Sequence, residues 1–294
     1  MKRTLKHRGE RLFSEETVLQ CRSAHMEDIV EMLHELTRAE CSRIVAECDT
    51  LISGTDIGDD KRVACIKILI GLLPLSLDVI ERRLRLREGR HAYENHFTLF
   101  CFLDLCVLKA IGVSHVVKER LLSSLSEYLH NVSTEKAHAA WMCGDLLGDH
   151  WENDTEAMNV LLLAAEEADY VPGRLGALHG IECLVNSDAY PGSKTSERVT
   201  DALFRVANLD RSAKVRRWAC EILDRVISKA GGAKEKLSTL QRLTTFVAEN
   251  PMDDVFKDCC LSMLRQLAAS DRSVRVRSYA QRMIKGLRGV GSAH

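Results

Sequence analysis

Residues 210–226 read DRSAKVRRWACEILDRV, and residues 271–287 read DRSVRVRSYAQRMIKGL. The two stretches align without a gap at an offset of 61 residues, and both begin with Asp-Arg-Ser. Each carries Arg at its seventh position and Ala at its tenth, and its apolar residues recur at spacings of three and four. This spacing is typical of the buried face of an α-helix. The sequence therefore repeats a helical unit.

A third copy of the pattern lies near the start of the chain, in DIGDDKRVACIKILIGL at residues 56–72. It places Asp56, Arg62 and Cys65 at the matching positions, and two weaker copies surround Ala139 and Ala177. The small residues of the five copies stand at 65, 139, 177, 219 and 280. Neighbouring copies lie about 40 residues apart, with space for a degenerate copy after the first and an extra helix at 233–249. A period near 40 built from two helices predicts a helical solenoid.

The Asp, the Arg six residues later and the small residue three further on resemble the second helix of HEAT repeats. The resemblance implies a ladder of polar links between successive repeats, formed by Asp56 with Arg62, Asp210 with Arg216 and Asp271 with Arg277. An Asp just before a helix can also accept the free backbone N–H groups of its first turn. We therefore predict an all-α solenoid, an α-α superhelix, of about six or seven HEAT-like helix pairs.

Helical periodicity extends over nearly the whole chain. We expect residues 1–54 to form an N-terminal helical cap that is continuous, as one domain, with a HEAT-like solenoid at 55–294. The predicted helices are 14–23, 25–52 (one helix or two), 60–73, 76–88, 94–111, 114–129, 134–149, 154–168, 173–186, 195–208, 212–229, 233–249, 252–269 and 273–287. The four prolines are expected between helices, and Asn153 with Glu156 fits a capping box.

Composition limits where in the cell the protein can lie and which partners it can bind. Lys plus Arg (41) and Asp plus Glu (42) nearly cancel, so any charge that binds nucleic acid or anionic lipid must be local. The 11 cysteines form no C-x-x-C pair, and we expect reduced, buried thiols. The N-terminus has no apolar stretch typical of an export signal, and Asp104 and Lys109 interrupt the most hydrophobic window. We expect a cytoplasmic protein without membrane contact.

One acidic stretch, GDLLGDHWEND at residues 144–154, has the composition of a divalent-metal site. Its candidate ligands are Asp145, Asp149, His150, Glu152 and Asp154. A solvated turn between helices explains the stretch equally simply, and we favour that interpretation.

Other catalytic patterns are missing from the sequence. Deoxyhypusine hydroxylase, a HEAT-repeat enzyme, binds iron with several His-Glu pairs, whereas this chain has the single pair His34-Glu35. It has no G-x-S-x-G elbow and no glycine-rich phosphate loop. His138 and His179 are expected at the surface or between repeats. We therefore predict no catalytic residue, metal ligand or cofactor, although groups that converge only in the fold would escape this test.

Basic residues on exposed helix faces are the candidates for partner binding. In ERRLRLREGRH at residues 81–91, Arg83, Arg87 and Arg90 share one side of a predicted helix. The repeated C-terminal stretches add Arg217, Arg225, Arg275 and Arg282. Such a row can hold a phosphate backbone, but most charged runs are solvated helix faces.

Two functions follow. The first is a non-catalytic HEAT-repeat scaffold or adaptor that binds a protein partner along its curved helical surface. The alternative is a HEAT-like solenoid that binds nucleic acid. Alkylpurine DNA glycosylases are HEAT-like solenoids that hold a duplex against a basic concave face, with Trp and Asp beside the damaged nucleotide. This chain has Trp141, Trp151 and Trp218, with Asp145 one turn after Trp141, but no matching motif surrounds them.

Overall fold

The computed structural model describes Cys21 and residues 24–53, 58–85, 113–133, 137–149, 154–187 and 193–289. Within these ranges the chain forms thirteen helices and no strand, which confirms the all-α prediction. The helices are α2 (Met26–His34), α3 (Arg38–Ser53), α4 (Asp59–Gly71), α5 (Leu77–Arg85), α8 (His115–Asn131), α9 (Ala137–Asp149), α10 (Thr155–Glu167), α11 (Val171–Asn186), α12 (Ser193–Leu209), α13 (Ala213–Lys229), α14 (Ala233–Glu249), α15 (Asp254–Ser270) and α16 (Val274–Gly289). No helix in the described ranges is long and apolar enough to cross a membrane.

Helix boundaries agree with the periodicity, but two local expectations were wrong. The 25–52 span, for which one helix or two was expected, is two helices, α2 and α3, separated by residues 35–37. Pro172 lies within the first turn of α11, where it removes no internal hydrogen bond, instead of between helices. The N-cap of α10 is Asp154, which accepts from the backbone N–H groups of Glu156 and Ala157, so the capping box expected at Asn153 is replaced. The predicted spans 14–23 and 94–111 lie outside the described residues, apart from Cys21.

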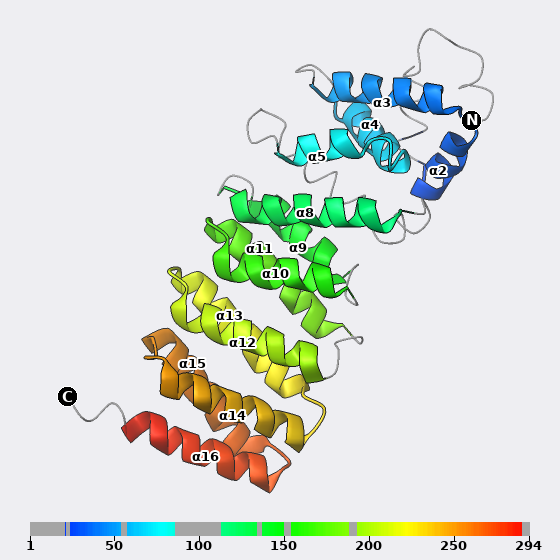
Figure 1. The fold of residues 1–294 in the computed structure, drawn as a ribbon. Coiled ribbons are helices and arrows are strands. Elements are labelled where there is room, and N and C mark those ends of the chain that lie inside the picture. Colours follow the sequence, from blue (N-terminus) through cyan, green and yellow to red (C-terminus); the bar gives the residue numbers. More distant parts are fainter. Residues whose placement is uncertain are drawn as a thin grey trace.

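From α8 onward the helices stack in two rows (Figure 1). Successive contacts run through α8, α10, α12, α14 and α16 in one row, and through α9, α11, α13 and α15 in the other. The core lies between the rows, where the rings of Phe204, Phe246 and Phe256, from α12, α14 and α15, pack with centroids 5.6–6.4 Å apart. The stack is a helical solenoid, as predicted.

The two repeated stretches occupy different rows. Their shared resemblance to the second helix of a HEAT repeat predicts equivalent places in the stack, but the first forms α13 and the second forms α16. Because two helices, α14 and α15, separate them, strict alternation places α16 beside α14 and not beside α13. Ala219 and Ala280 are nonetheless both fully buried. The shared pattern therefore specifies a small, buried helix face and does not specify the row.

A seam of four glycines holds α9 against α11. Gly144 and Gly148 on α9 meet Gly176 and Gly180 on α11, and in each pair the spacing is four residues. A Cβ atom added to Gly180 would lie 2.6 Å from the carbonyl oxygen of Gly144, and one added to the other three would overlap backbone atoms even more closely. The two backbones are therefore in direct contact, an approach that larger residues would block.

A polar ladder crosses the loops at Asp210. Its carboxylate forms an ion pair with Arg174 Nε at 2.7 Å and accepts from the backbone N–H of Ser212. Arg216 instead donates to the carbonyl oxygen of Asp210 and forms an ion pair with Asp253 at 3.1 Å. The ladder thus runs from α11 to the α12–α13 loop and on to the loop before α15.

The second ladder pair repeats this arrangement, and the third is only partly described. Arg277 donates to the carbonyl oxygen of Asp271, whose carboxylate binds Lys236 Nζ on α14 at 2.8 Å. Arg62 is buried and pairs with Asp59 at 2.9 Å, and Asp56 lies outside the described residues. Where both residues are described, the Arg contacts the backbone of its Asp, while the carboxylate binds a cation from an earlier helix.

A second ladder joins the row that contains α10, α12 and α14. Arg205 on α12 binds Glu166 on α10 with two hydrogen bonds of 2.7 and 2.8 Å. Arg242 on α14 binds Asp201 on α12, and Arg120 on α8 binds Glu81 on α5. The partners stand 39–41 residues apart, which is the repeat length. These bidentate pairs are the strong kind, so they fix how one helix sits on the next.

The glycine seam yields a first prediction. Gly144→Ala should destabilise the fold by about 1–3 kcal/mol or more, because the new methyl group overlaps the backbone of Gly176. Gly286→Ala on α16 is the matched control, since a Cβ there meets nothing within 4 Å, and it should stabilise the fold by about 0.4–1 kcal/mol. Urea unfolding followed by circular dichroism measures both. Equal effects of the two variants would show that α9 and α11 are not in backbone contact.

The Asp271 contact yields a prediction on pH. A hydrogen bond from Lys236 lowers the pKa of Asp271 below its ordinary value. A carboxyl whose pKa is lower in the folded state stabilises the fold above its unfolded pKa of about 4, and loses that contribution as the pH falls through the folded value. Asp271→Asn should therefore be less stable than the wild type at pH 7, and the difference should shrink below about pH 4. Urea midpoints across this range test it; a difference independent of pH would contradict the ion pair.

Candidate functional site

Two of the predicted partner-binding arginines engage other helices. Arg83 forms an ion pair with Asp49 and donates to the Asp49 carbonyl oxygen at 2.7 Å, with its side chain only 13% exposed. It thereby ties α5 to α3. Arg225 on α13 forms an ion pair with Glu182 on α11. Arg87 and Arg90 lie outside the described residues.

The remaining three arginines are exposed but do not form one strip. Arg217 lies on α13, whereas Arg275 and Arg282 lie on α16, in the other row. The guanidinium of Arg282 sits 5.4 Å from the ring centroid of Tyr279, within range of a cation–π contact. These three residues therefore offer separate local charges to a ligand.

Three aromatic side chains meet across α9, α11 and α13. Trp141 lies with its ring centroid 4.1 Å from that of His179 and 4.9 Å from that of Trp218, and the two indoles stack at 28°. We call Trp141, His179 and Trp218 the aromatic cluster. The residues stand 38 and 39 apart in the sequence, so each repeat contributes one ring. Trp141 is 40% exposed, while Trp218 is partly buried.

Carboxylates hold this cluster on two sides. His179 Nε2 lies 2.6 Å from Asp145 Oδ1, and its Nδ1 lies 3.9 Å from Glu182 Oε2. Trp218 Nε1 donates to the same Glu182 oxygen at 3.0 Å, and Arg225 pairs with that carboxylate. The imidazole thus sits between two acids while stacked on an indole. We singled out Trp141, Asp145 and Trp218 from the sequence, but not their contact with His179 and Glu182.

A thiol completes the group one turn beyond His179. Cys183 Sγ lies 3.4 Å from Asp145 Oδ1 and 4.0 Å from His179 Nε2. Burial, together with the carboxylates of Asp149 and Asp145, raises the pKa of the Cys183 thiol well above its ordinary value. At neutral pH the sulfur is therefore a protonated thiol, which is a poor nucleophile. The donor atoms of Asp145, His179 and Cys183 all lie within 4.8 Å of one another, a spacing that a metal ion can bridge.

The acidic stretch at 144–154 does not act as one unit. Asp145 points into the aromatic cluster, and Asp149 lies beside Cys183. Asp154 caps α10 and forms an ion pair with Lys118 on α8, which gives it a structural role. His150 and Glu152 lie outside the described residues. The residues that approach Asp145 come from α11, about 35 positions later, and the spacing within 144–154 gave no signal for them.

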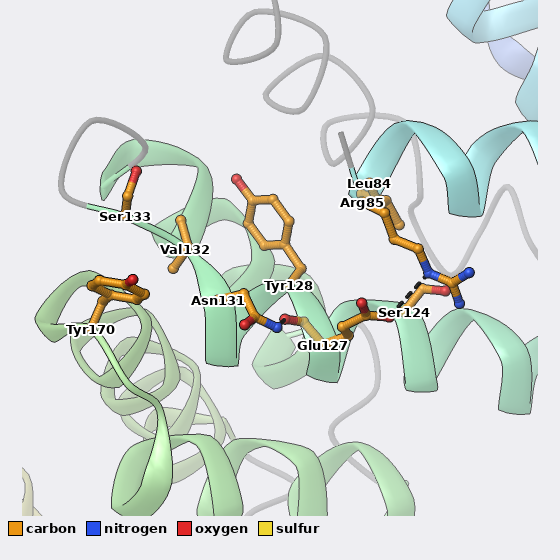
Figure 2. Close-up of a pocket in the computed structure, with 9 residues that line it drawn as sticks. All are labelled: Leu84, Arg85, Ser124, Glu127, Tyr128, Asn131, Val132, Ser133 and Tyr170. Carbon is orange, nitrogen blue, oxygen red and sulfur yellow. Dashed lines mark hydrogen bonds and ion pairs between the residues drawn. The ribbon is translucent and has the colours of Figure 1, made fainter. Parts of the chain in front are cut away.

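A separate small pocket lies between α5, α8 and the start of α11 (Figure 2). Arg85 and Glu127 close one side of it through a contact of 3.0 Å, and Tyr128 and Tyr170 line the other. Its volume is about 120 Å³. Sites for drug-sized ligands usually measure roughly 300–1,000 Å³, so this pocket suits at most a very small molecule.

Comparisons with known proteins assign no function to this site. No family model matches the chain, and no curated protein matches it. Among solved structures, the crystal structure of an engineered protein from a structural genomics consortium matches 90% of this chain and 96% of its own. The two share 14% sequence identity with a TM-score of 0.41, a likeness too weak to support any argument about function.

Proposed function

We propose that the chain is a non-catalytic, HEAT-like scaffold or adaptor that binds a protein partner through the surface of α9, α11 and α13. The observation that carries the proposal is Trp141, a large aromatic side chain left 40% exposed and held by stacking on His179 and Trp218. Tryptophan is enriched among the residues that dominate binding energy at protein interfaces. A ring already held in place loses little conformational entropy on binding.

The charges around Trp141 support a protein partner over a polyanion. Exposed residues of both signs lie on the same helices, among them Asp149 on α9 and Arg217 and Glu221 on α13. A mixed pattern suits a protein surface with complementary charges, whereas a phosphate backbone requires a run of cations.

We propose a cytoplasmic location for this scaffold. All nine described cysteines are unpaired, and seven of them are buried. Buried thiols of this kind persist where the environment keeps them reduced.

The proposal is tested with the full chain as bait in extract from its own host. The amount of partner protein retained should fall by at least roughly tenfold when the bait carries Trp141→Ala. Truncating a dominant interface residue costs about 2 kcal/mol or more of binding free energy. Leu163→Ala is the matched control, since Leu163 is 46% exposed but lies on α10, in the other row. Quantitative mass spectrometry measures retention. If no retained protein depends on Trp141, the proposed surface is wrong.

Nucleic-acid binding is a second candidate function. One observation favours it: Trp141, Asp145 and Trp218, the residue types that the glycosylase resemblance singles out, belong to a single cluster. Exposed indoles can stack on a base that leaves its helix. Under this hypothesis a labelled duplex should bind at low salt, lose affinity steeply as salt rises, and bind Trp141→Ala more weakly. Fluorescence anisotropy measures all three, and no binding at low salt would eliminate the candidate.

A further inference from the structure

Three donor atoms at the aromatic cluster have the chemistry and the spacing of metal ligands. An imidazole nitrogen, a thiol sulfur and a carboxylate oxygen converge from two adjacent helices, and all three side chains are partly buried. His179 and Cys183 stand four residues apart on α11, so both lie on the face that meets α9. Asp145 projects from α9 towards them. We infer that Asp145, His179 and Cys183 bind a zinc ion.

The distances agree with tetrahedral zinc after a small adjustment. Zn–S bonds of about 2.3 Å and Zn–N and Zn–O bonds of about 2.0–2.2 Å place tetrahedral ligand atoms roughly 3.3–3.7 Å apart. The sulfur lies 3.4 Å from the Asp145 oxygen and 4.0 Å from the His179 nitrogen. The nitrogen and the Asp145 oxygen, now 2.6 Å apart, must separate by roughly 0.7 Å to admit the ion.

The surroundings of His179 supply a second, independent observation. Its Nδ1 atom is buried and makes no hydrogen bond to any described residue. Histidines that bind a metal through one nitrogen usually donate the N–H of the other to a carboxylate. Glu182 Oε2 lies 3.9 Å from Nδ1, and Trp218 and Arg225 hold its carboxylate in place. Zinc bound at Nε2 would place the proton on Nδ1 and give it this partner.

The type of metal follows from the ligands. Imidazole and thiolate suit zinc, whereas magnesium and calcium prefer oxygen alone. The carboxylate of Asp145 beside the sulfur adds negative charge, which attracts a divalent cation. The fourth ligand of a tetrahedral zinc ion would be a water molecule or Asp149. A second group, His115, Glu119 and Glu156, offers no thiol and lies at the exposed surface, so we assign no ion to it.

The full chain, stripped with a chelator and dialysed, provides the test. Titration with zinc should give one tight site, and cobalt in its place should give the absorption band of a thiolate-to-cobalt charge transfer. Tryptophan emission should change with the same stoichiometry, because Trp141 stacks on His179. The cobalt spectrum of the wild type tests the proposal without any variant. If no thiolate-to-cobalt band appears after one equivalent of cobalt is added, the proposal is overturned.

Variants then identify the ligands. Cys183→Ala should abolish the cobalt band and weaken zinc binding by more than the roughly 10- to 100-fold that loss of an outer hydrogen-bond partner costs. Cys259→Ala is the matched control, because Cys259 is the other partly buried described cysteine and lies on α15. It should keep both the band and the affinity. Circular dichroism checks that each variant is folded. Unchanged zinc binding by a folded Cys183→Ala variant would assign the metal to other residues and overturn the proposal.

Discussion

The contact between the backbones of α9 and α11 is the constraint on which the candidate site depends. At Gly144, Gly148, Gly176 and Gly180 nothing larger than a hydrogen atom separates the two helices. Because α9 lies so near α11, the Trp141 ring reaches over His179 to stack on Trp218 of the third helix. The same approach brings Asp145 within contact of His179 and Cys183. Larger residues in the seam would separate all these groups together.

The polar ladders have a different role: they set the register of one repeat on the next. Apolar packing between rows is tolerant of small rotations, because many side-chain arrangements fill the same volume. An Arg held by two oxygens of one carboxylate allows much less freedom, as with Arg205 on Glu166. The buried link between Arg174 and Asp210 adds a cost if it is broken, since the remaining charge would have no partner. The ladders thus fix the orientation in which the exposed faces are presented.

Periodicity predicted the helices and the solenoid, because every buried face repeats its apolar residues at three and four. The row of each helix was not predictable in the same way. The stretches of α13 and α16 are alike in sequence, but their rows depend on how many helices intervene, which the pattern itself does not count. The polar ladder was only partly visible. Asp210 and Arg216 stood out by their spacing, whereas Arg174 and Lys236, which bind the two carboxylates, have no motif around them.

The site was hidden for a related reason. Trp141, Asp145 and Trp218 stand out in the sequence because of their residue types. Their contact in space depends on the closeness of α9 and α11, which was not predicted from the sequence. The spacing of four between the glycines on both helices was the available signal in the sequence. His179 and Cys183 carry no metal motif, because a site shared between repeats takes its ligands about one repeat length apart, at a spacing that no short motif contains.

Glu182 connects the aromatic cluster with the proposed metal site. It accepts from Trp218, pairs with Arg225 and lies beside Nδ1 of His179, so contacts of both α11 and α13 depend on one carboxylate. If His179 donates to Glu182 when a metal binds, the carboxylate must share its oxygens between the imidazole and the indole. The same Glu182 oxygen already accepts from Trp218 and lies nearest to His179 Nδ1, so the two proposed sites share one acceptor.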